Sequence, residues 1–406
     1  SNTKFKEMLD LEKAIENSLE LIKQLGSKKV DLINAAGYYN ISNIISPVDL
    51  PGFDNSAMDG YAIINSDLKQ ATKFKPKRLE CIERSPAGTL PNKDIKSGTC
   101  IRVFTGSPIP LGANAVIMQE DCNIQKNNIV IKNQVKPWEN IRIKGEDIRK
   151  GDKLISKGEK INAGIIGLLS AVGYKTIEVI RQPKVGLIAT GSELIEPQKN
   201  LSLGKIFESN RTMLAAMVKQ SNALPTVYPI VKDDLKKTVS ALKTAFAEND
   251  LIITSGGVSV GDHDYIKAAF EQIGGKINFW KVSIKPGKPI MVGQANRKIL
   301  FGLPGNPISA LITFLLIVRP SILKLQGAKN CHLKKYKGIL KNEIINNGNR
   351  RHFIRVKLNE DSYVSILGNQ RSHMLRGLPE TNGLIDMPPN SRLANGDKVE
   401  VLLIPD

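Results

Sequence analysis

The spacing of apolar residues changes several times along this chain, and each change predicts a different kind of structure. Residues 5–25 carry apolar side chains at helical intervals, with polar residues between them. Residues 61–137 instead form short apolar runs separated by Gly, Pro and Asn, which is typical of short strands. Residues 163–174 (AGIIGLLSAVGY) return to a helical pattern that ends at Gly173.

From residue 183 onward, strand-like apolar runs alternate with helical segments. Helices are predicted at 210–220, 233–248, 265–273 and from Ile308, and strands at KVGLIAT, PTVYPIV, DLIITSGG, INFWKVSI, PIMVG and KILFGLP. This alternation predicts a mostly parallel sheet that is covered by helices on both faces. After Gly327 the pattern returns to short strands, which favours a small C-terminal β-barrel or sandwich.

We therefore predict a multidomain α/β protein with four parts. Residues 1–50 and 141–180 form an N-terminal helical and linker domain, and residues 51–140 form an inserted β-rich module. Residues 181–328 form the α/β domain, and residues 329–406 form the C-terminal β domain. The longest apolar stretch, 310–318, ends at Arg319-Pro320 and is too short to cross a bilayer, so no membrane association is expected.

Composition and charge narrow the functional classes. The 406 residues are 41% hydrophobic and 24% charged, which is ordinary for a soluble globular protein. The net charge of +19 favours anionic partners such as nucleic acid, anionic lipid or a phosphorylated small molecule. Neither a nucleic-acid-binding motif nor interleaved aromatic and basic residues occur, so no nucleic acid is expected. The four cysteines form no CxxC pair and no signal-peptide pattern opens the sequence, which favours the cytoplasm.

Three unusual loops follow strands of the predicted parallel sheet: TGSE, SGGVSVG and LPGNP. Ligands of open parallel sheets bind beyond the carboxyl ends of the strands, and glycines let backbone N–H groups approach an anion. In LPGNP, Pro307 suits a first helical position, Pro304 stiffens the turn and Gly305 supplies freedom for the bend between them, so the turn can present its backbone to a ligand. A purely structural tight turn is the alternative. The candidate ligand-binding residues are Gly256, Gly257, Ser259, Gly261, Pro304, Gly305, Asn306 and Pro307.

Lysines and carboxylates gather near the same edge. Lys281 and Lys285 are four positions apart, so a continuous strand would place both on one face, where an anion would separate their charges. A solvated basic edge strand is the alternative. Carboxylates at strand-to-helix junctions can hold Mg²⁺ or simply cap helices; the metal candidates are Glu193, Asp233, Asp234 and Asp264.

Seven motifs, in order along the chain, resemble those of the molybdopterin molybdenumtransferases, the family that includes the E domain of gephyrin. They are LPGFDNSAMDGYAI, RVFTGSPIP, KGEDIRKGD, IATGSELIEP, SGGVSVGDHDY, FWKVSIKPGKP and GLPGNPISA. The resemblance implies an elongated homodimer of four-part subunits that inserts molybdate into adenylylated molybdopterin, releases AMP and requires Mg²⁺. It also implies molybdopterin adenylyltransferase and molybdoenzyme maturation factors as partners.

The resemblance further implies a set of catalytic residues. Because Asp59 and Thr105 belong to the inserted module, the site is expected to combine residues of two subunits. One of Asp233 and Asp234 is expected to complete the acidic set, and the sequence leaves the choice between them open. The implied catalytic residues are Asp59, Thr105, Asp147, Glu193, Asp264, Lys281 and Lys285.

Two other functions share parts of this pattern. A molybdopterin adenylyltransferase would have the central α/β domain but would lack the SAMDGYA module and the C-terminal β domain, both of which occur here. A non-catalytic scaffold, as in the receptor clustering of gephyrin, would be favoured by loss of the lysine pair or the acidic set, and all of these residues are present.

Overall fold

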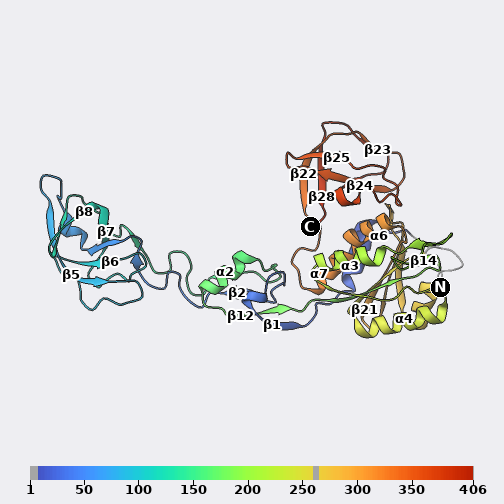
Figure 1. The fold of residues 1–406 in the computed structure, drawn as a ribbon, viewed down its shortest axis with the longest axis horizontal. Helices are drawn as coiled ribbons and strands as arrows, with labels where there is room; N and C mark the ends of the chain where they lie inside the picture. The colour runs from blue at the N-terminus through green and yellow to red at the C-terminus, as the bar shows by residue number, and fades with distance from the viewer. Residues whose placement is uncertain (1–7, 259–264, 406) are drawn as a thin grey trace. The chain divides into compact units, whose positions relative to one another are not determined.

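A computed structural model describes residues 8–258 and 265–405, and the chain divides into two compact units (Figure 1). The first unit comprises Ser1–Ile41, Lys157–Asn162 and Thr176–Asp406, and the second comprises Ser42–Ser156 and Ala163–Lys175. The four-part division expected from the sequence is finer than this two-part division. The fold class is the predicted one: a multidomain α/β protein with a mostly parallel central sheet, a β-rich module and a C-terminal barrel.

The second unit is built around a six-stranded sheet with the order β7-β4-β6-β5-β9-β8. Its strands are β4 (Gly60–Ile63), β5 (Lys77–Ser85), β6 (Thr99–Val103), β7 (Ala115–Met118), β8 (Cys122–Gln125) and β9 (Asn128–Ile131). Only the β5–β6 pair is parallel. Short pairs, β2 (Ile44–Ile45) with β11 (Lys153–Ile155) and β3 (Asn55–Ser56) with β10 (Ile141–Arg142), and the helix α2 (Ala163–Ala171) complete the unit.

The central sheet of the first unit has the order β16-β13-β17-β21-β20-β18. The strands β13 (Lys184–Ala189), β16 (Leu224–Val227), β17 (Leu251–Ser255) and β21 (Lys298–Leu303) are parallel. The strands β20 (Pro289–Ala295) and β18 (Lys276–Lys281) extend the sheet in antiparallel fashion. A small parallel pair, β14 (Leu194–Ile195) with β15 (Ile206–Phe207), lies outside this sheet.

Helices cover both faces of the central sheet because its strands alternate their apolar side chains between two cores. Leu251 and Ile253 of β17 join one core with α3 (Asn210–Gln220) and α6 (Pro307–Thr313). Ile252, between them, joins the other core with α4 (Leu235–Glu248) and α5 (Tyr265–Gln272). Such strands are buried on both faces and read as continuous apolar runs in the sequence.

The N-terminal helix belongs to the first unit. The helix α1 (Leu11–Glu20) packs on α7 (Arg319–Leu325), with Leu11 and Ala14 buried in the same core as α6. It is shorter than the helical pattern over 5–25 predicts, and residues 5–7 of that pattern lie outside the described part. An antiparallel pair that the sequence did not predict follows, β1 (Ser27–Asp31) with β12 (Thr176–Ile180).

The apolar helix after LPGNP runs to Leu325. It continues from α6 through a π-helical turn (Phe314–Val318) into α7 and passes Arg319-Pro320, where the longest apolar stretch of the sequence ends. Pro320 follows directly on the π-helical turn and lacks the N–H that an uninterrupted α-helix would use there. Within the described chain, Pro307–Leu325 is the one helix with the length and composition to cross a membrane, but 89% of its most apolar window is buried in the fold.

The C-terminal region forms a closed five-stranded barrel. Its strands are β22 (Lys335–Leu340), β24 (Arg351–Leu358), β25 (Tyr363–Ile366), β26 (Gly383–Met387) and β28 (Lys398–Leu403), and the β24–β26 pairing closes the ring. A short strand of the α/β region, β19 (Ile284–Lys285), adds to β24. The pair β23 (Ile344–Asn346) with β27 (Ser391–Leu393) lies beside the barrel sheet.

Candidate active site

A cleft of about 700 Å³ opens where the carboxyl ends of β13, β17 and β21 meet. These strands are neighbours, so the three loops that the sequence singled out are brought to one edge. A loop of the C-terminal barrel contributes His373 and Leu375 to the lining. The sequence-predicted residues that line the cleft are Glu193, Gly256, Gly257, Pro304, Gly305, Asn306 and Pro307.

Gly256 and Gly257 allow two of these loops to touch. Both have positive φ, +83° and +66°, a conformation that L side chains rarely adopt. A Cβ on Gly256 would lie 2.6 Å from the carbonyl oxygen of Thr190, and a Cβ on Gly257 would lie 2.7 Å from the Thr190 hydroxyl. The loop after β17 therefore needs glycine at both positions to lie against the loop after β13.

Asn210, at the start of α3, connects the second and third loops. Its side-chain amide donates to the hydroxyl of Ser255 at 2.6 Å and to the carbonyl of Gly305 at 2.7 Å. Asn210 and Thr190 both line the cleft. The Oδ1 atom of Asn210 and the hydroxyl of Thr190 are buried and have no hydrogen-bond partner among the described residues. Buried polar atoms are nearly always paired, so these two are suited to a polar ligand. Asn210 was not among the predicted site residues, because a polar residue at a helix start is ordinarily a cap.

The LPGNP turn begins α6 and also contacts the C-terminal barrel. Pro307 is the first residue of α6, as expected, and the Asn306 side chain donates to the hydroxyl of Ser372 at 3.1 Å. Gly305 was expected to provide backbone freedom, but its φ is not positive and an added Cβ would meet only the Gly256 Cα, at 3.7 Å. That expectation was wrong, because the chain makes this turn without a positive φ at Gly305.

Asp233 and Asp234 have different partners. The Asp234 carboxylate accepts the backbone N–H of Lys237 at 2.8 Å and so caps α4. The Asp233 carboxylate accepts the N–H of Ser192 at 2.9 Å, and its own N–H donates to the Ser192 hydroxyl at 3.1 Å. Asp233 is thus tied to the loop that carries Glu193. The other predicted residues nearby, Ser259, Gly261 and Asp264, lie outside the described residues.

Lys281 and Lys285 do not share one continuous strand. β18 ends at Lys281, whose partner is the cleft-lining residue Pro289, and the chain turns before Lys285, which pairs with His352 of β24. The premise of a common strand face was therefore wrong, because the backbone bends to reach the barrel. Neither lysine is among the described residues that line the cleft.

His352 adds a third basic side chain next to Lys285. It is 8% exposed, and its Nε2 has no hydrogen-bond partner within the described chain. Burial, together with the charges of Lys285 and Arg350, lowers the pKa of His352 to about 4. The imidazole is therefore neutral at physiological pH and adds no further positive charge there.

Asp59 and Thr105 lie together in the second unit. One carboxylate oxygen of Asp59 accepts both the backbone N–H of Thr105, at 2.8 Å, and its hydroxyl, at 3.1 Å. These bonds, with a smaller effect of the Arg102 charge, lower the pKa of Asp59. Asp147 is exposed in the same unit, and its N–H donates to the carbonyl of Leu50. Of the three predicted catalytic residues in the second unit, Asp59 and Thr105 are therefore hydrogen-bonded to each other, and Asp147 has a different partner.

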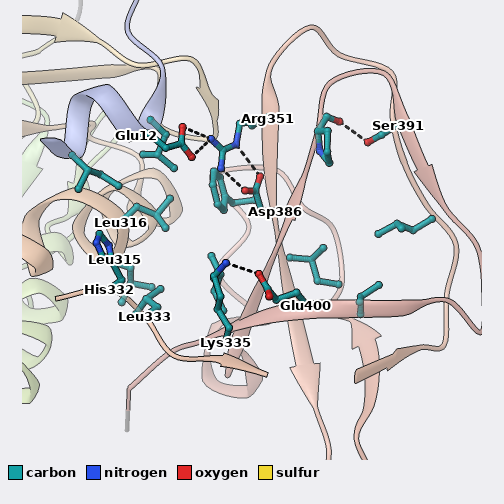
Figure 2. A pocket seen from close by; sticks show the side chains of 18 of the residues that line it. Glu12, Leu315, Leu316, His332, Leu333, Lys335, Arg351, Asp386, Ser391 and Glu400 are labelled. Atoms are coloured by element: carbon teal, nitrogen blue, oxygen red, sulfur yellow. Dashed lines mark hydrogen bonds and ion pairs between the residues drawn. The ribbon is translucent and has the colours of Figure 1, made fainter. Parts of the chain in front are cut away.

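A second cavity, of about 520 Å³, lies in the first unit between α1, the long helix and the barrel (Figure 2). Figure 2 shows Arg351 of β24 reaching both Glu12 of α1 and Asp386 of β26. Glu12 accepts from Nη1 of Arg351 at 2.6 and 2.7 Å, and these bonds lower its pKa. None of the sequence-predicted site residues lines this cavity. The Arg351–Glu12 ion pair attaches the barrel to α1, whereas the Arg351–Asp386 pair lies within the barrel.

Three family models match successive parts of the chain. The MoeA N-terminal region (domain I and II) matches residues 9–173, and a probable molybdopterin binding domain matches residues 186–324. The MoeA C-terminal region (domain IV) matches residues 337–404. The second of these matches contains all three loops that form the cleft.

Similar proteins cover nearly the whole chain. A molybdopterin molybdenumtransferase of Staphylococcus epidermidis is 34% identical over 97% of this chain and 95% of its own, and one of Haemophilus influenzae is 39% identical over 79% of each. The crystal structure of the molybdopterin biosynthesis moeA protein from Pyrococcus horikoshii OT3 superposes with a TM-score of 0.86 at 32% identity, over 98% of this chain and 100% of that one. With this cleft, these loops and this coverage, the chain belongs to the molybdopterin molybdenumtransferase family and is an enzyme of molybdenum cofactor biosynthesis.

Proposed function

We propose that this enzyme inserts molybdate into adenylylated molybdopterin, releases AMP and uses Mg²⁺ for the reaction. The observation that carries the proposal is the cleft at the ends of β13, β17 and β21, where three strand-end loops meet. The proposed substrates, a nucleotide-linked pterin and molybdate, are all anions. A chain with net charge +19 attracts such ligands, and the glycine loops present backbone N–H groups to them.

The described residues of the cleft have distinct proposed roles. The backbone around Gly256 and Gly257 would hold a phosphate group, because no side chain there obstructs its approach. Asn210 and Thr190 would supply the unpaired Oδ1 and hydroxyl to polar groups of the pterin nucleotide. Lys281 and Lys285 would stabilise the anions electrostatically, Lys281 from beside Pro289.

The carboxylates fit Mg²⁺ bound together with a phosphorylated substrate. Glu193 and Asp233 lie on two loops that are joined by the hydrogen bond from Ser192 to Asp233. Within residues 8–258 and 265–405, no group of three or more Asp, Glu, His or Cys side chains could hold a metal ion without further ligands. Mg²⁺ commonly takes one or two carboxylates and completes its shell with water and phosphate oxygens. When bound, the ion would neutralise charge that develops on the phosphate as AMP leaves.

The choice between Asp233 and Asp234 is tested by two matched variants. Asp233→Asn should raise the Mg²⁺ concentration needed for half-maximal AMP release, because it removes the negative charge bonded to Ser192, the residue before Glu193. Asp234→Asn should leave that concentration unchanged, because Asn caps a helix about as well as Asp. The opposite ranking would transfer the metal role to Asp234.

We further propose that the enzyme is a cytoplasmic homodimer in which Asp59 and Thr105 of one subunit complete the cleft of the other. Asp59→Asn and Glu193→Gln should each abolish turnover alone. Co-expressed with two different tags and purified as the mixed dimer, they should regain about half of the wild-type rate per dimer, because one of the two sites has both residues intact. A mixed dimer without activity would show that each site uses residues of a single chain.

The reaction itself is tested by measuring AMP from adenylylated molybdopterin with and without molybdate in the presence of Mg²⁺. Release that depends on molybdate is the expected result. A folded protein that binds the pterin but releases no AMP would instead favour the scaffold function, and binding of molybdopterin adenylyltransferase can be measured on the same preparation.

A further inference from the structure

Two cysteines of the β-rich unit face each other across neighbouring strands. Cys81 of β5 and Cys100 of β6 are register partners in the parallel pair. Both side chains contribute to the same apolar core of this unit, Cys100 fully and Cys81 in part. Partner Cα atoms on adjacent strands lie about 4.8 Å apart, which is inside the range of about 4.4–6.8 Å that a disulfide requires. The strand pairing therefore places these thiols where a disulfide can form.

The two thiols differ in access. Cys100 is 0% exposed and belongs to the core of the unit. Cys81 is half-buried and lines a cavity of about 740 Å³, together with Arg84, Arg102 and Lys126. A reagent in this cavity meets Cys81 first and cannot reach Cys100 directly. The three basic side chains favour an anionic reagent.

The electrostatic environment also separates the two thiols. The hydrogen bond from Cys100, supported by the backbone N–H groups of Arg102 and Glu83 and by the Arg102 charge, lowers the pKa of Cys81 to about 6 despite partial burial. The same hydrogen bond, together with burial, raises the pKa of Cys100 well above its usual range. Cys122, the third thiol near Tyr61, has its pKa raised to about 12 by burial. At neutral pH, Cys81 is the thiolate of this cluster.

We propose that Cys81 and Cys100 form a thiol-modification site for anionic low-molecular-weight disulfides of the glutathione type. The Cys81 thiolate attacks one sulfur of the disulfide, forms a mixed disulfide and releases one equivalent of thiolate. Cys100 then gives up its proton and attacks Sγ of Cys81, which expels the second thiolate and leaves a Cys81–Cys100 disulfide. The reagent gains two electrons in all and the two protein sulfurs lose them. The two released thiolates take up one proton from Cys100 and one from the solvent.

This inference does not depend on the proposed reaction. β6 nevertheless carries both Cys100 and Arg102, and it ends two residues before Thr105, the partner of Asp59. Arg102 also donates to the carbonyl of Gly60, next to Asp59. Oxidation would thus act on the strand that positions the Asp59–Thr105 pair.

Intact-mass analysis of the full chain after incubation with glutathione disulfide tests the two steps. The wild-type protein should lose two hydrogens, with the Cys81–Cys100 link identified by peptide mapping and reversed by dithiothreitol. Cys100→Ser should stop at the first step and carry one glutathione on Cys81. Cys81→Ser should carry none, and Cys331→Ser, from the other unit, should behave as wild type. A wild-type protein that keeps four free thiols under these conditions would overturn the proposal, as would glutathione on Cys331 or Cys122 alone.

The rate of alkylation by iodoacetamide gives a second measurement that needs no variant. At pH 6, a thiol with a pKa near 6 is about half ionised, against roughly 0.3% for an ordinary thiol with a pKa near 8.5. The lower intrinsic nucleophilicity of the more acidic thiolate removes about a factor of ten from this advantage. Cys81 should therefore react about tenfold faster than free glutathione at pH 6. Equal or slower reaction of Cys81 would contradict its assignment as the attacking thiolate.

Discussion

Replacing Gly256 by Ala tests how closely the two loops of the cleft must approach. The chain offers a matched control, because Gly274 has the same φ of +83° but an added Cβ there would meet nothing within 4 Å. At Gly256 the same Cβ would lie 2.6 Å from the Thr190 carbonyl oxygen. The two substitutions therefore share the backbone strain and differ in the collision.

The expected magnitudes follow from these two contributions. A left-handed conformation costs Ala about 1–2 kcal/mol, and the stiffer unfolded chain returns about 0.4–1 kcal/mol, so Gly274→Ala should lose roughly 1 kcal/mol. Relieving the collision at Gly256 requires the loop after β13 to move by several tenths of an ångström, and overpacking of this kind typically costs about 1–3 kcal/mol more. Thr190 cannot move freely, because its N–H donates to the carbonyl of Ser255.

Urea unfolding followed by tryptophan fluorescence measures the difference. The indole of Trp280 donates to the carbonyl of Val258 at 3.1 Å, so its emission reports on the first unit. Trp138, the other tryptophan, lies in the second unit and is replaced by Phe in all variants so that only one unit is observed. Equal losses of stability for Gly256→Ala and Gly274→Ala would refute the argument from close approach. AMP release should fall about tenfold or more only for Gly256→Ala, because its strain displaces the loop that leads to Glu193.

Three further substitutions test other contacts of the first unit. Asn210→Ala should lower the free energy of unfolding by about 1–3 kcal/mol in urea, because it leaves the buried Ser255 hydroxyl and the more exposed Gly305 carbonyl without their donor. Wild-type protein should lose up to about 3 kcal/mol of stability as the pH falls from about 6.5 to about 4, because His352 binds a proton in the unfolded chain but stays neutral when it is buried in the folded one. His352→Gln should remove this loss. Arg351→Met should cost about 1–2 kcal/mol, because two partly exposed carboxylates lose their cation. If the stability of His352→Gln falls with pH as the wild type's does, the role given to His352 is contradicted. Wild-type urea midpoints for Asn210→Ala or Arg351→Met would contradict the roles given to those residues.

The α/β region was predictable because its local signals agree with one another. The apolar run of β17 is buried on both faces, and the helical pattern over 210–220 coincides with the observed helix α3. The glycine loops could be placed at one sheet edge because the carboxyl ends of parallel strands share that edge. Pro307 could be placed at the start of a helix because it tolerates the missing N–H there.

Features that depend on remote contacts were not predictable in the same way. The bend between Lys281 and Lys285 exists because β19 pairs with β24 of the barrel, more than sixty positions away in the sequence. The role of Asn210 depends on Ser255 and Gly305, which lie on two different loops. No local pattern distinguishes such residues from ordinary turn or cap residues.

Asp233 and Asp234 show most directly where inference from the sequence ends. They are identical residues at consecutive positions, and both precede the same helix, so any local pattern treats them alike. Asp234 accepts an N–H three positions ahead of it, a partner that the helix itself provides, whereas Asp233 accepts the N–H of Ser192, which only the folded sheet brings near. A carboxylate whose partner is local is explained by the helix alone. One that fixes a remote loop beside Glu193 contributes to the geometry of the cleft, and we therefore expect the loss of charge at Asp233, and not at Asp234, to change the requirement for Mg²⁺.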